Sequence, residues 1–396
     1  MTIIEPPTRS TLLSEAMLQS FDQRAPGYDA ANQFFAEDFD ELRRSGYLLA
    51  AVPEAFGGAG LRLADVAGLQ RRLAAHAPAT AIAVNMHLYW TGVAADLWRN
   101  GDDTLSWVLE RARQGHVFAA GHGERGNDVP LLASTTTAER VPGGWRFTGH
   151  KIFGSLAPVW SYLGIHGMDL SDPDRPQVVH GFVHRDAPGV QIVKTWDTLG
   201  MRATSSDDTV LEGVFVPDEQ IALVCPAGFG GLGPFQLNVF AWGMVGFAAV
   251  YLGIADRAYT LAVGNATDRT TISLSRRLAH HPLVQASIAG MRMKLETCSA
   301  LLAVTAGDWD AGVEHGMAWP IKLLTAKHEI VNAAWQIVDE AVELSGGAAL
   351  FKGNRLEQLF RDARFGRVHP GNSLFTREVV GKLALGINPD EQPRWG

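Results

Sequence analysis

Cysteine is scarce in this chain, since only Cys225 and Cys298 occur among its 396 residues. Two isolated cysteines have neither the spacing of a zinc site nor the number needed for a disulfide framework, so we expect no metal centre and a reducing compartment. Basic residues are too scattered to form a face for nucleic acid or membrane, and the formal net charge is -8. These absences argue against a nucleic-acid-binding, membrane-binding or disulfide-stabilised protein.

Long apolar runs are also rare, with one exception at residues 239–255. That run approaches the length of a membrane span, but Trp, Gly and Tyr residues interrupt it, and a polar helical pattern follows it. The first ten residues, MTIIEPPTRS, lack the basic start and apolar core of a signal peptide. We therefore expect a buried core helix and a cytoplasmic protein.

What the chain does contain is a hydrophobic pattern whose period changes twice. Apolar residues at three-and-four spacing predict helices up to about Gln114, and alternating segments rich in Val and Thr predict strands from His116 to about Pro217. After the glycine-rich segment PAGFGGLGP, four long helical patterns follow, at residues 235–262, 283–308, 317–345 and 374–385. We expect an α+β protein with a helical domain (1–115), a β domain (116–226) and a four-helix bundle (227–396).

Four motifs in this order carry a resemblance to a known family. They are PEAFGGAGL (residues 53–61), GHKIFGS (149–155), GMRATSSDDTVLEGVFVP (200–217) and ELSGGAALFKGNRLEQLFRDAR (343–364). Through them the chain resembles the acyl-CoA dehydrogenase superfamily over nearly its whole length. The resemblance implies an N-terminal helical domain, a central β-barrel-like domain and a C-terminal four-helix bundle. It also implies a flavin between the strands and the bundle, and a homotetramer.

The resemblance places one wall of the flavin site at GHKIFGS. An aromatic side chain such as Phe153 can cover the isoalloxazine ring, and a hydroxyl such as that of Ser155 can hydrogen-bond its N5 atom. Arg202, Thr204 and Ser206 have two-residue spacing, so in a strand they share one face, which borders the flavin or the substrate mouth. An ordinary strand end for Ser155 and a solvated edge strand for the other three are the alternatives.

The predicted adenosine end of the flavin departs from the family pattern. Gly346 and Gly347 end a long helical pattern, and the family uses such a pair to hold the adenosine half of FAD from a neighbouring subunit. Many helices end in glycine without such a role. Glu343 stands where the family has glutamine, and the segment SRRLAHHPLVQ lacks the usual Phe-Gly, although Arg276 and Arg277 could meet phosphate. The sequence thus leaves FAD and FMN, or exchangeable reduced FMN, open.

The residue that removes a proton in the family's dehydrogenases is missing. One family position for this glutamate falls on Pro370, within His369-Pro370-Gly371-Asn372, and the other falls on Gln236. Neither proline nor glutamine accepts a proton, so the usual dehydrogenation of an acyl-CoA has no base at these positions.

The residues that remain resemble the monooxygenase branch of the superfamily, similar to dibenzothiophene monooxygenase, which uses reduced flavin from a partner reductase. The matching positions are His369, His87 and Ser155, which we predict to be catalytic, and we predict Asn372 as a flavin contact. In that branch, imidazoles at these positions hydrogen-bond the peroxide that forms on reduced flavin and give it a proton. A satisfied core histidine is the alternative for His87, and a turn cap is the alternative for His369.

The sequence therefore predicts a flavin-dependent oxidoreductase, with a monooxygenase of a small apolar or aromatic substrate favoured. An acyl-CoA or acyl-carrier-protein dehydrogenase with a displaced base, and a flavin-binding scaffold, are the alternatives. His122, Glu124, His280 and His281 are further polar candidates without a predicted role.

Overall fold

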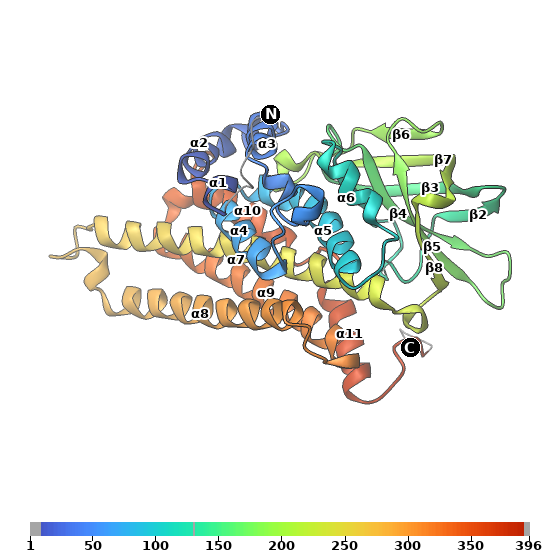
Figure 1. The fold of residues 1–396 in the computed structure, drawn as a ribbon. Coiled ribbons are helices and arrows are strands. Elements are labelled where there is room, and N and C mark those ends of the chain that lie inside the picture. The colour runs from blue at the N-terminus through green and yellow to red at the C-terminus, as the bar shows by residue number, and fades with distance from the viewer. Residues whose placement is uncertain (1–8, 130, 392–396) are drawn as a thin grey trace.

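The structure is a computed structural model that describes residues 9–129 and 131–391. The predicted absence of a signal peptide concerns the first ten residues, of which 1–8 lie outside the described residues. The described chain forms helices, then strands, then helices again, and Figure 1 shows the sheet at one end of the molecule beside the helices. This is the order that the hydrophobic periods predict.

The helices before the sheet are α1 (Arg9–Leu12), α2 (Glu15–Ala31), α3 (Ala36–Arg44), α4 (Leu63–His76), α5 (Pro78–Arg99) and α6 (Ser106–Arg113). Local signals set their ends. Ser14 caps α2 by accepting a hydrogen bond from the N–H of Met17 (3.2 Å), and Asn32 ends it with a left-handed φ of 48°. Helix α5 is buried from Pro78 to Leu97, as expected of a helix that is apolar on every face.

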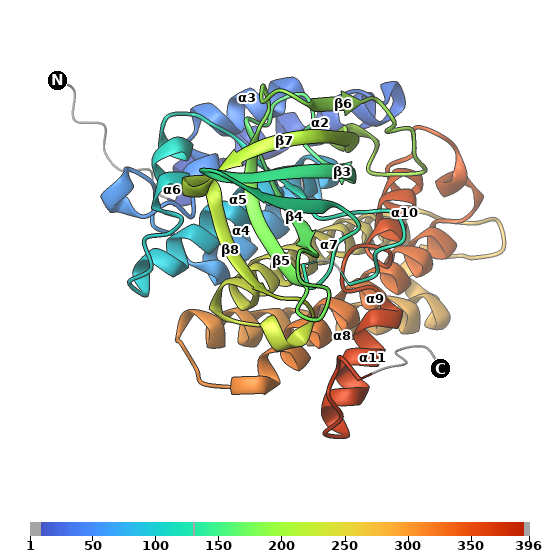
Figure 2. The ribbon, with the colours of Figure 1, turned by 90° about the vertical axis from the view of Figure 1, so that its right-hand side faces the viewer.

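The strands are β1 (Phe118–Gly121), β2 (Thr137–Val141), β3 (Gly144–Gly154), β4 (Tyr162–Asp169), β5 (Gln177–His184), β6 (Val190–Val193), β7 (Asp207–Pro217) and β8 (Ile221–Pro226). They form one sheet in the order β6-β7-β3-β2-β4-β5-β8, and β1 pairs in parallel with β4. Figure 2 shows β3 and β7 crossing the direction of β5 and β8, so the sheet is strongly twisted. The described strands leave this barrel-like sheet open between β6 and β8.

The helices after the sheet are α7 (Pro234–Asp268), α8 (Pro282–Asp310), α9 (Trp319–Ser345), α10 (Arg355–Phe365) and α11 (Ser373–Ala384). The four predicted bundle helices are present as α7, α8, α9 and α11. The short helix α10 is a fifth; it begins within the last family motif and ends one residue beyond it, and the hydrophobic pattern does not separate it from its neighbours.

Helix α7 contains the long apolar run. Among the described residues it is the one helix that could cross a membrane by length and composition, but 89% of its most apolar window is buried inside the protein. It packs against α4, α5 and α9, which explains why all its faces are apolar. The prediction of a buried core helix is confirmed.

Candidate active site

A deep pocket lies where α5, α7 and the loops beside the sheet meet. It holds about 1220 Å³ of space outside the protein atoms, its open mouth included. Most of its wall is apolar, with side chains such as Met86 of α5 and Phe240 and Met244 of α7. Its polar side chains are Tyr89, His122, Ser155, Trp196, Thr204, Ser206 and His369. No Asp, Glu, Lys or Arg of the described residues lines it, so the pocket suits a ligand whose buried part is uncharged.

Left-handed backbone surrounds the polar part of this wall. Six non-glycine residues of the described chain have positive φ values, and five of them line the pocket or adjoin a lining residue. These five are Leu131 (φ 75°), Phe153 (φ 60°), Leu156 (φ 66°), Met201 (φ 52°) and Ser205 (φ 45°). Such conformations cost ~1 kcal/mol or more per residue, and they tend to gather where geometry serves a site.

Two loops bring the hydroxyl groups together. The end of β3 carries Ser155, and the segment before β7 contains a 3-10 turn, η3 (Arg202–Thr204), followed by Ser206. The Ser206 Oγ lies 2.7 Å from the Ser155 Oγ and 2.7 Å from the Thr204 Oγ1. The strand expected through residues 202–206 is therefore wrong, and the three hydroxyls meet through two facing loops instead.

His369 lies between α10 and α11 on the pocket wall. Its ring stacks on Phe247, with centroids 4.9 Å apart and planes at 20°. Burial, assisted by the nearby Lys327 charge, lowers the pKa of His369 to about 3, so the imidazole is neutral near pH 7. Its buried Nε2 has no hydrogen-bond partner among the described residues.

Lys327 of α9 holds the turn that carries His369. Its Nζ donates to the carbonyls of Gly366 (3.0 Å), His369 (3.3 Å) and Gly371 (3.1 Å). These carbonyls lie at and beyond the end of α10, where unsatisfied C=O groups favour a cation. Burial lowers the pKa of Lys327 to about 7, and the three acceptors favour its charged form.

A second neutral imidazole faces the pocket from the segment after β1. The Nδ1 of His122 lies 3.2 Å from the Tyr89 hydroxyl of α5, and both residues line the pocket. Burial, together with His180 and the Lys151 charge, keeps the pKa of His122 well below its ordinary value. Its Nε2 is buried and has no partner within the described chain, so the Tyr89–His122 pair keeps one unused hydrogen-bonding atom beside the pocket.

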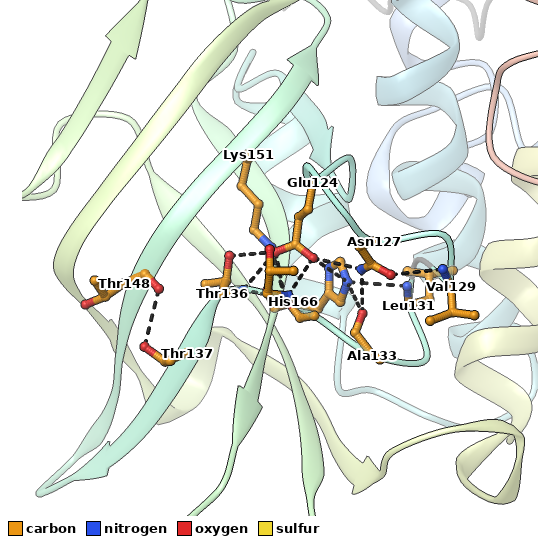
Figure 3. Close-up of polar contacts among 12 residues, drawn as sticks. Glu124, Asn127, Val129, Leu131, Ala133, Thr136, Thr137, Thr148, Lys151 and His166 are labelled. Atoms are coloured by element: carbon orange, nitrogen blue, oxygen red, sulfur yellow. Dashed lines mark hydrogen bonds and ion pairs between the residues drawn. The ribbon is translucent and has the colours of Figure 1, made fainter. Parts of the chain in front are cut away.

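Behind this wall, Figure 3 shows a buried cluster around Glu124 and Lys151. The Glu124 carboxylate accepts hydrogen bonds from Lys151 Nζ (2.6 Å), the Ser134 and Thr136 hydroxyls (2.6 Å each), Asn127 Nδ2 (2.8 Å) and the N–H groups of Thr135 (3.0 Å) and Thr136 (3.1 Å). Burial alone would raise the pKa of Glu124, but Lys151 and the hydroxyls lower it to about 2. A carboxylate so fully bonded, and off the pocket wall, is a structural anchor and a poor proton acceptor.

His87, which we predicted to be catalytic, lies outside the pocket lining. Its Nδ1 accepts a hydrogen bond from the N–H of Phe118 (3.0 Å), so Nε2 carries the proton and donates to the Leu48 carbonyl (3.0 Å). The residue is 1% exposed, and burial lowers its pKa to about 4. With both ring nitrogens used, His87 joins α5 to β1 and to the 3-10 turn η1 (Tyr47–Leu49), which is the core-histidine alternative.

Two predicted cofactor contacts are likewise used elsewhere. The Arg202 guanidinium donates to the Asp29 carbonyl (2.9 Å) and the Asp197 carboxylate (3.1 Å), so it ties η3 to α2. The Asn372 side chain caps α11 by accepting from two N–H groups of its first turn, both at 3.0 Å. Neither side chain lines the pocket.

Gly346 and Gly347 lie at the end of α9, also outside the pocket. Gly346 has φ 71°, and its N–H bonds back to the last turn of the helix (3.1 Å). This is the ordinary way in which glycine ends a helix. Contact of these glycines with the adenosine of a flavin in a neighbouring chain stays a prediction.

The two family positions for a catalytic glutamate have different surroundings. Pro370 lines the pocket. Gln236 is 1% exposed and caps α7, because its Oε1 accepts from the N–H of Gly233 (3.0 Å) while its Nε2 lies 3.0 Å from the Cys225 sulfur. Neither position presents a carboxylate to the pocket.

Sequence reasoning missed Lys327 and Tyr89. Lys327 has apolar residues three and four positions away on both sides in LLTAKHEIV, and this spacing on the buried face of a helix could have revealed it. Tyr89 had no comparable signal, because every face of α5 is apolar and the pattern does not show which one borders a pocket.

One wall of the pocket fits a flat aromatic cofactor. Phe153, Trp196 and Phe365 follow one another, with ring centroids 6.0 Å apart at both steps, and Phe153 is 59% exposed. The polar residues Ser155 and His369 line the same pocket. The planes of successive rings stand at 88° and 64°, so a flat isoalloxazine ring could stack on one exposed ring face, such as that of Phe153, and not along all three.

The helices, the sheet and the second set of helices thus surround a pocket that no Asp, Glu, Lys or Arg of the described residues lines. The chain belongs to the acyl-CoA dehydrogenase superfamily, because the family's N-terminal domain matches residues 13–105 and its C-terminal domain matches residues 231–385. Together the two matches cover more than half of the chain.

The names of individual relatives state different activities. The chain is 29% identical over 366 residues to YdbM of Bacillus subtilis, named as an acyl-CoA dehydrogenase, and the match covers 92% of each chain. It is 26% identical over 393 residues to L-evernosamine nitrososynthase of a Micromonospora species, covering 96% of this chain and 90% of the relative. KijD3, solved in complex with FMN and dTDP-3-amino-2,3,6-trideoxy-4-keto-3-methyl-D-glucose, is similar with a TM-score of 0.84 and 26% identity, over 98% of this chain and 97% of that chain.

Proposed function

We propose that this protein is a flavin-dependent monooxygenase that uses reduced flavin and O2 on a small, mainly apolar substrate. The observation that carries the proposal is the pocket wall, where none of the described lining residues is Asp or Glu. Dehydrogenation of a saturated acyl-CoA needs a base for the proton next to the carbonyl, whereas oxygenation by a reduced cofactor does not. The FMN in the KijD3 structure and the nitrososynthase relative support a cofactor and chemistry of this kind.

A bound reduced flavin supplies two electrons and the position at which O2 reacts. In this protein Phe153 and Trp196 would hold its ring, and the Ser155 hydroxyl would bond its edge. His369 lines the pocket as a neutral imidazole, stacked on Phe247 and with its backbone held by Lys327, and a small rotation of the ring would bring Nε2 to a ligand. A neutral imidazole in a dry site can donate or accept one well-directed hydrogen bond without the cost of burying a charge.

The substrate that fits is largely apolar with one hydrogen-bonding group. Apolar side chains of α5 and α7 form much of the pocket wall, while the Tyr89–His122 pair offers one hydrogen bond. A hydroxyl or an amine meets that requirement, because a neutral imidazole can accept from either. A carboxylate or phosphate does not, since no cation of the described residues lines the wall.

A second candidate is an acyl-CoA dehydrogenase with a displaced base, which the identity to YdbM favours. His369 or His122 would then have to accept the proton. Burial depresses the pKa of both imidazoles, so each is a weak base near pH 7.

We propose that the protein is a cytoplasmic homotetramer and that a flavin reductase supplies its reduced flavin. The apolar face of α9 is buried within the chain, whereas α8 exposes Leu283, Met293 and Val304, so α8 is the surface for contact between copies. Sedimentation at micromolar concentration checks this, and a monomer would contradict it.

Anaerobic spectroscopy separates the two candidate activities. We expect no loss of flavin absorbance when octanoyl-CoA is added to the oxidised flavoprotein without oxygen. Supplying reduced FMN and O2 should give hydrogen peroxide slowly in the wild type and at least several times faster in His369→Ala. His281→Ala, at the exposed start of α8, is the matched control and should behave as the wild type. Rapid bleaching by octanoyl-CoA would establish the dehydrogenase instead.

A further inference from the structure

Three hydroxyl groups form a hydrogen-bonded row that ends at the pocket. The Thr204 Oγ1 lies 2.9 Å from the Met201 carbonyl and 2.7 Å from the Ser206 Oγ, which lies 2.7 Å from the Ser155 Oγ. Thr204 and Ser206 are 1% and 3% exposed, whereas Ser155 is half-buried at the pocket. Each hydroxyl has a single proton to donate, so the direction of one bond constrains the next.

The carbonyl at the inner end sets that direction. A carbonyl oxygen only accepts, so the bond to Met201 uses the Thr204 proton. The Thr204 oxygen must then accept from Ser206, and the Ser206 oxygen must accept from Ser155. All three protons are then used within the row, so the Ser155 oxygen can only accept a hydrogen bond from a ligand in the pocket.

The opposite direction is possible only with the loss of one bond. When Ser155 donates into the pocket, only the Ser206 and Thr204 protons remain for the three bonds of the row, so one bond is lost. Full reversal, in which Ser206 donates to Ser155 and Thr204 to Ser206, loses the bond from the Thr204 hydroxyl to Met201. The Met201 carbonyl would keep the Trp196 indole N–H and the Thr204 N–H, both at 3.1 Å. The bias toward an accepting Ser155 is therefore about one ordinary hydrogen bond, or roughly fivefold in an equilibrium constant.

The backbone holds this row in place. The N–H of Leu156 donates to the Thr204 carbonyl and the N–H of Ala157 donates to the Ser205 carbonyl, both at 3.2 Å, so the two loops are joined on either side of the hydroxyls. From the other side, the N–H of Met201 donates to the buried Asp362 carboxyl (2.6 Å). The row is thus formed by the protein alone.

We propose that Thr204 and Ser206 are positioning residues that turn Ser155 into a hydrogen-bond acceptor, so that the site prefers reduced over oxidised flavin. The proposal rests on the proposed function, which puts a flavin ring edge at Ser155. Reduced flavin carries an N–H at N5, where oxidised flavin has a nitrogen that only accepts. An accepting Ser155 therefore bonds the reduced ring with every hydroxyl of the row satisfied, whereas the oxidised ring requires the reversed row and its lost bond.

The test is the ratio of two dissociation constants, for oxidised FMN and for dithionite-reduced FMN, measured without oxygen by quenching of tryptophan fluorescence. Thr204→Val keeps the shape of the side chain and removes the link to Met201, so we expect its ratio of oxidised to reduced constant to be about fivefold lower than in the wild type. Ser206→Ala interrupts the row at its middle and should lower the ratio similarly. Thr204→Ser restores the hydroxyl and should keep the wild-type ratio.

Thr91→Val is the matched control, because the Thr91 hydroxyl is buried and bonds backbone carbonyls of α5 outside the pocket lining. Its ratio should equal that of the wild type. Equal ratios in the wild type, Thr204→Val and Ser206→Ala would overturn the role of the row and leave the proposed function standing. Failure of the wild type to bind FMN or FAD in either state would overturn both.

Discussion

Replacing Glu124 with glutamine should destabilise the protein more than replacing Lys151 with methionine. The two side chains form an ion pair at 2.6 Å, and both are 1% exposed or less. Removing one partner of such a pair costs ~3–5 kcal/mol, because the other charge stays buried without compensation. The remaining hydrogen bonds decide how that cost differs between the two partners.

Glu124 without Lys151 keeps five hydrogen-bond donors, from two hydroxyls, two backbone N–H groups and the Asn127 amide. Lys151 without Glu124 keeps only the His166 carbonyl at 2.6 Å and the Ser134 hydroxyl at 3.4 Å. We therefore expect the full ~3–5 kcal/mol for Glu124→Gln and ~2 kcal/mol for Lys151→Met. The double variant should cost less than the sum, because it leaves neither charge alone.

Urea unfolding at pH 7, followed by tryptophan fluorescence, measures the three apparent free energies. The exposed pair of Arg140 and Asp218 supplies the control, since Asp218→Asn should barely move the unfolding midpoint. A Lys151→Met variant as unstable as Glu124→Gln, or strict additivity in the double variant, would refute this account of the cluster.

Three further outcomes follow from buried groups near the pocket. Lys327→Met should destabilise the protein by ~2 kcal/mol in urea unfolding and speed amide exchange in the turn at residues 366–371, since three carbonyls lose their donor. Burial raises the pKa of Asp362 from 3.8 to about 7, so the folded protein holds the proton of this carboxyl more tightly than the unfolded chain does. The stability that this proton gives is fully present below pH ~4 and is lost as the pH rises to ~7. Thermal melts between pH 5 and pH 8 should accordingly show that the melting temperature of Asp362→Asn rises relative to that of the wild type as the pH rises. A difference in melting temperature that does not change with pH would contradict this. His87→Phe should lower the free energy of unfolding by ~2 kcal/mol, because a buried N–H and a buried carbonyl lose their partner. It should leave the affinity for FMN unchanged. A large drop in that affinity would show that His87 does contribute to the site.

The sequence predicted the architecture well because the hydrophobic period and the family motifs both indicate the order of helices, strands and helices. The long apolar run becomes part of α7, and the change to alternating residues falls where β1 begins. The helix α10 escaped separation because it is short and lies close to the turn at His369.

The site was harder to predict, because a motif fixes a position in the chain and not the direction of a side chain. Ser155 and His369 do reach the pocket, whereas His87 sits two residues before Tyr89 on a helix whose faces all look alike. Asn372 and Arg202 are polar residues next to the pocket whose hydrogen bonds are used by the backbone. Only the three-dimensional arrangement shows which polar groups are left for a ligand.

The left-handed residues around the pocket carry a consequence for protein engineering. Glycine at Phe153, Leu156, Met201 or Ser205 would relieve backbone strain of ~1 kcal/mol at each position. It would also remove the side chains and the rigid loops that shape the hydroxyl row. Leu156 and Met201 are buried, so glycine there would also leave a cavity that costs ~2–5 kcal/mol, more than the strain it relieves. Directed evolution for heat resistance would thus favour glycine at Phe153 and Ser205 alone among the four, and screening each round for cofactor retention would be needed to keep the site.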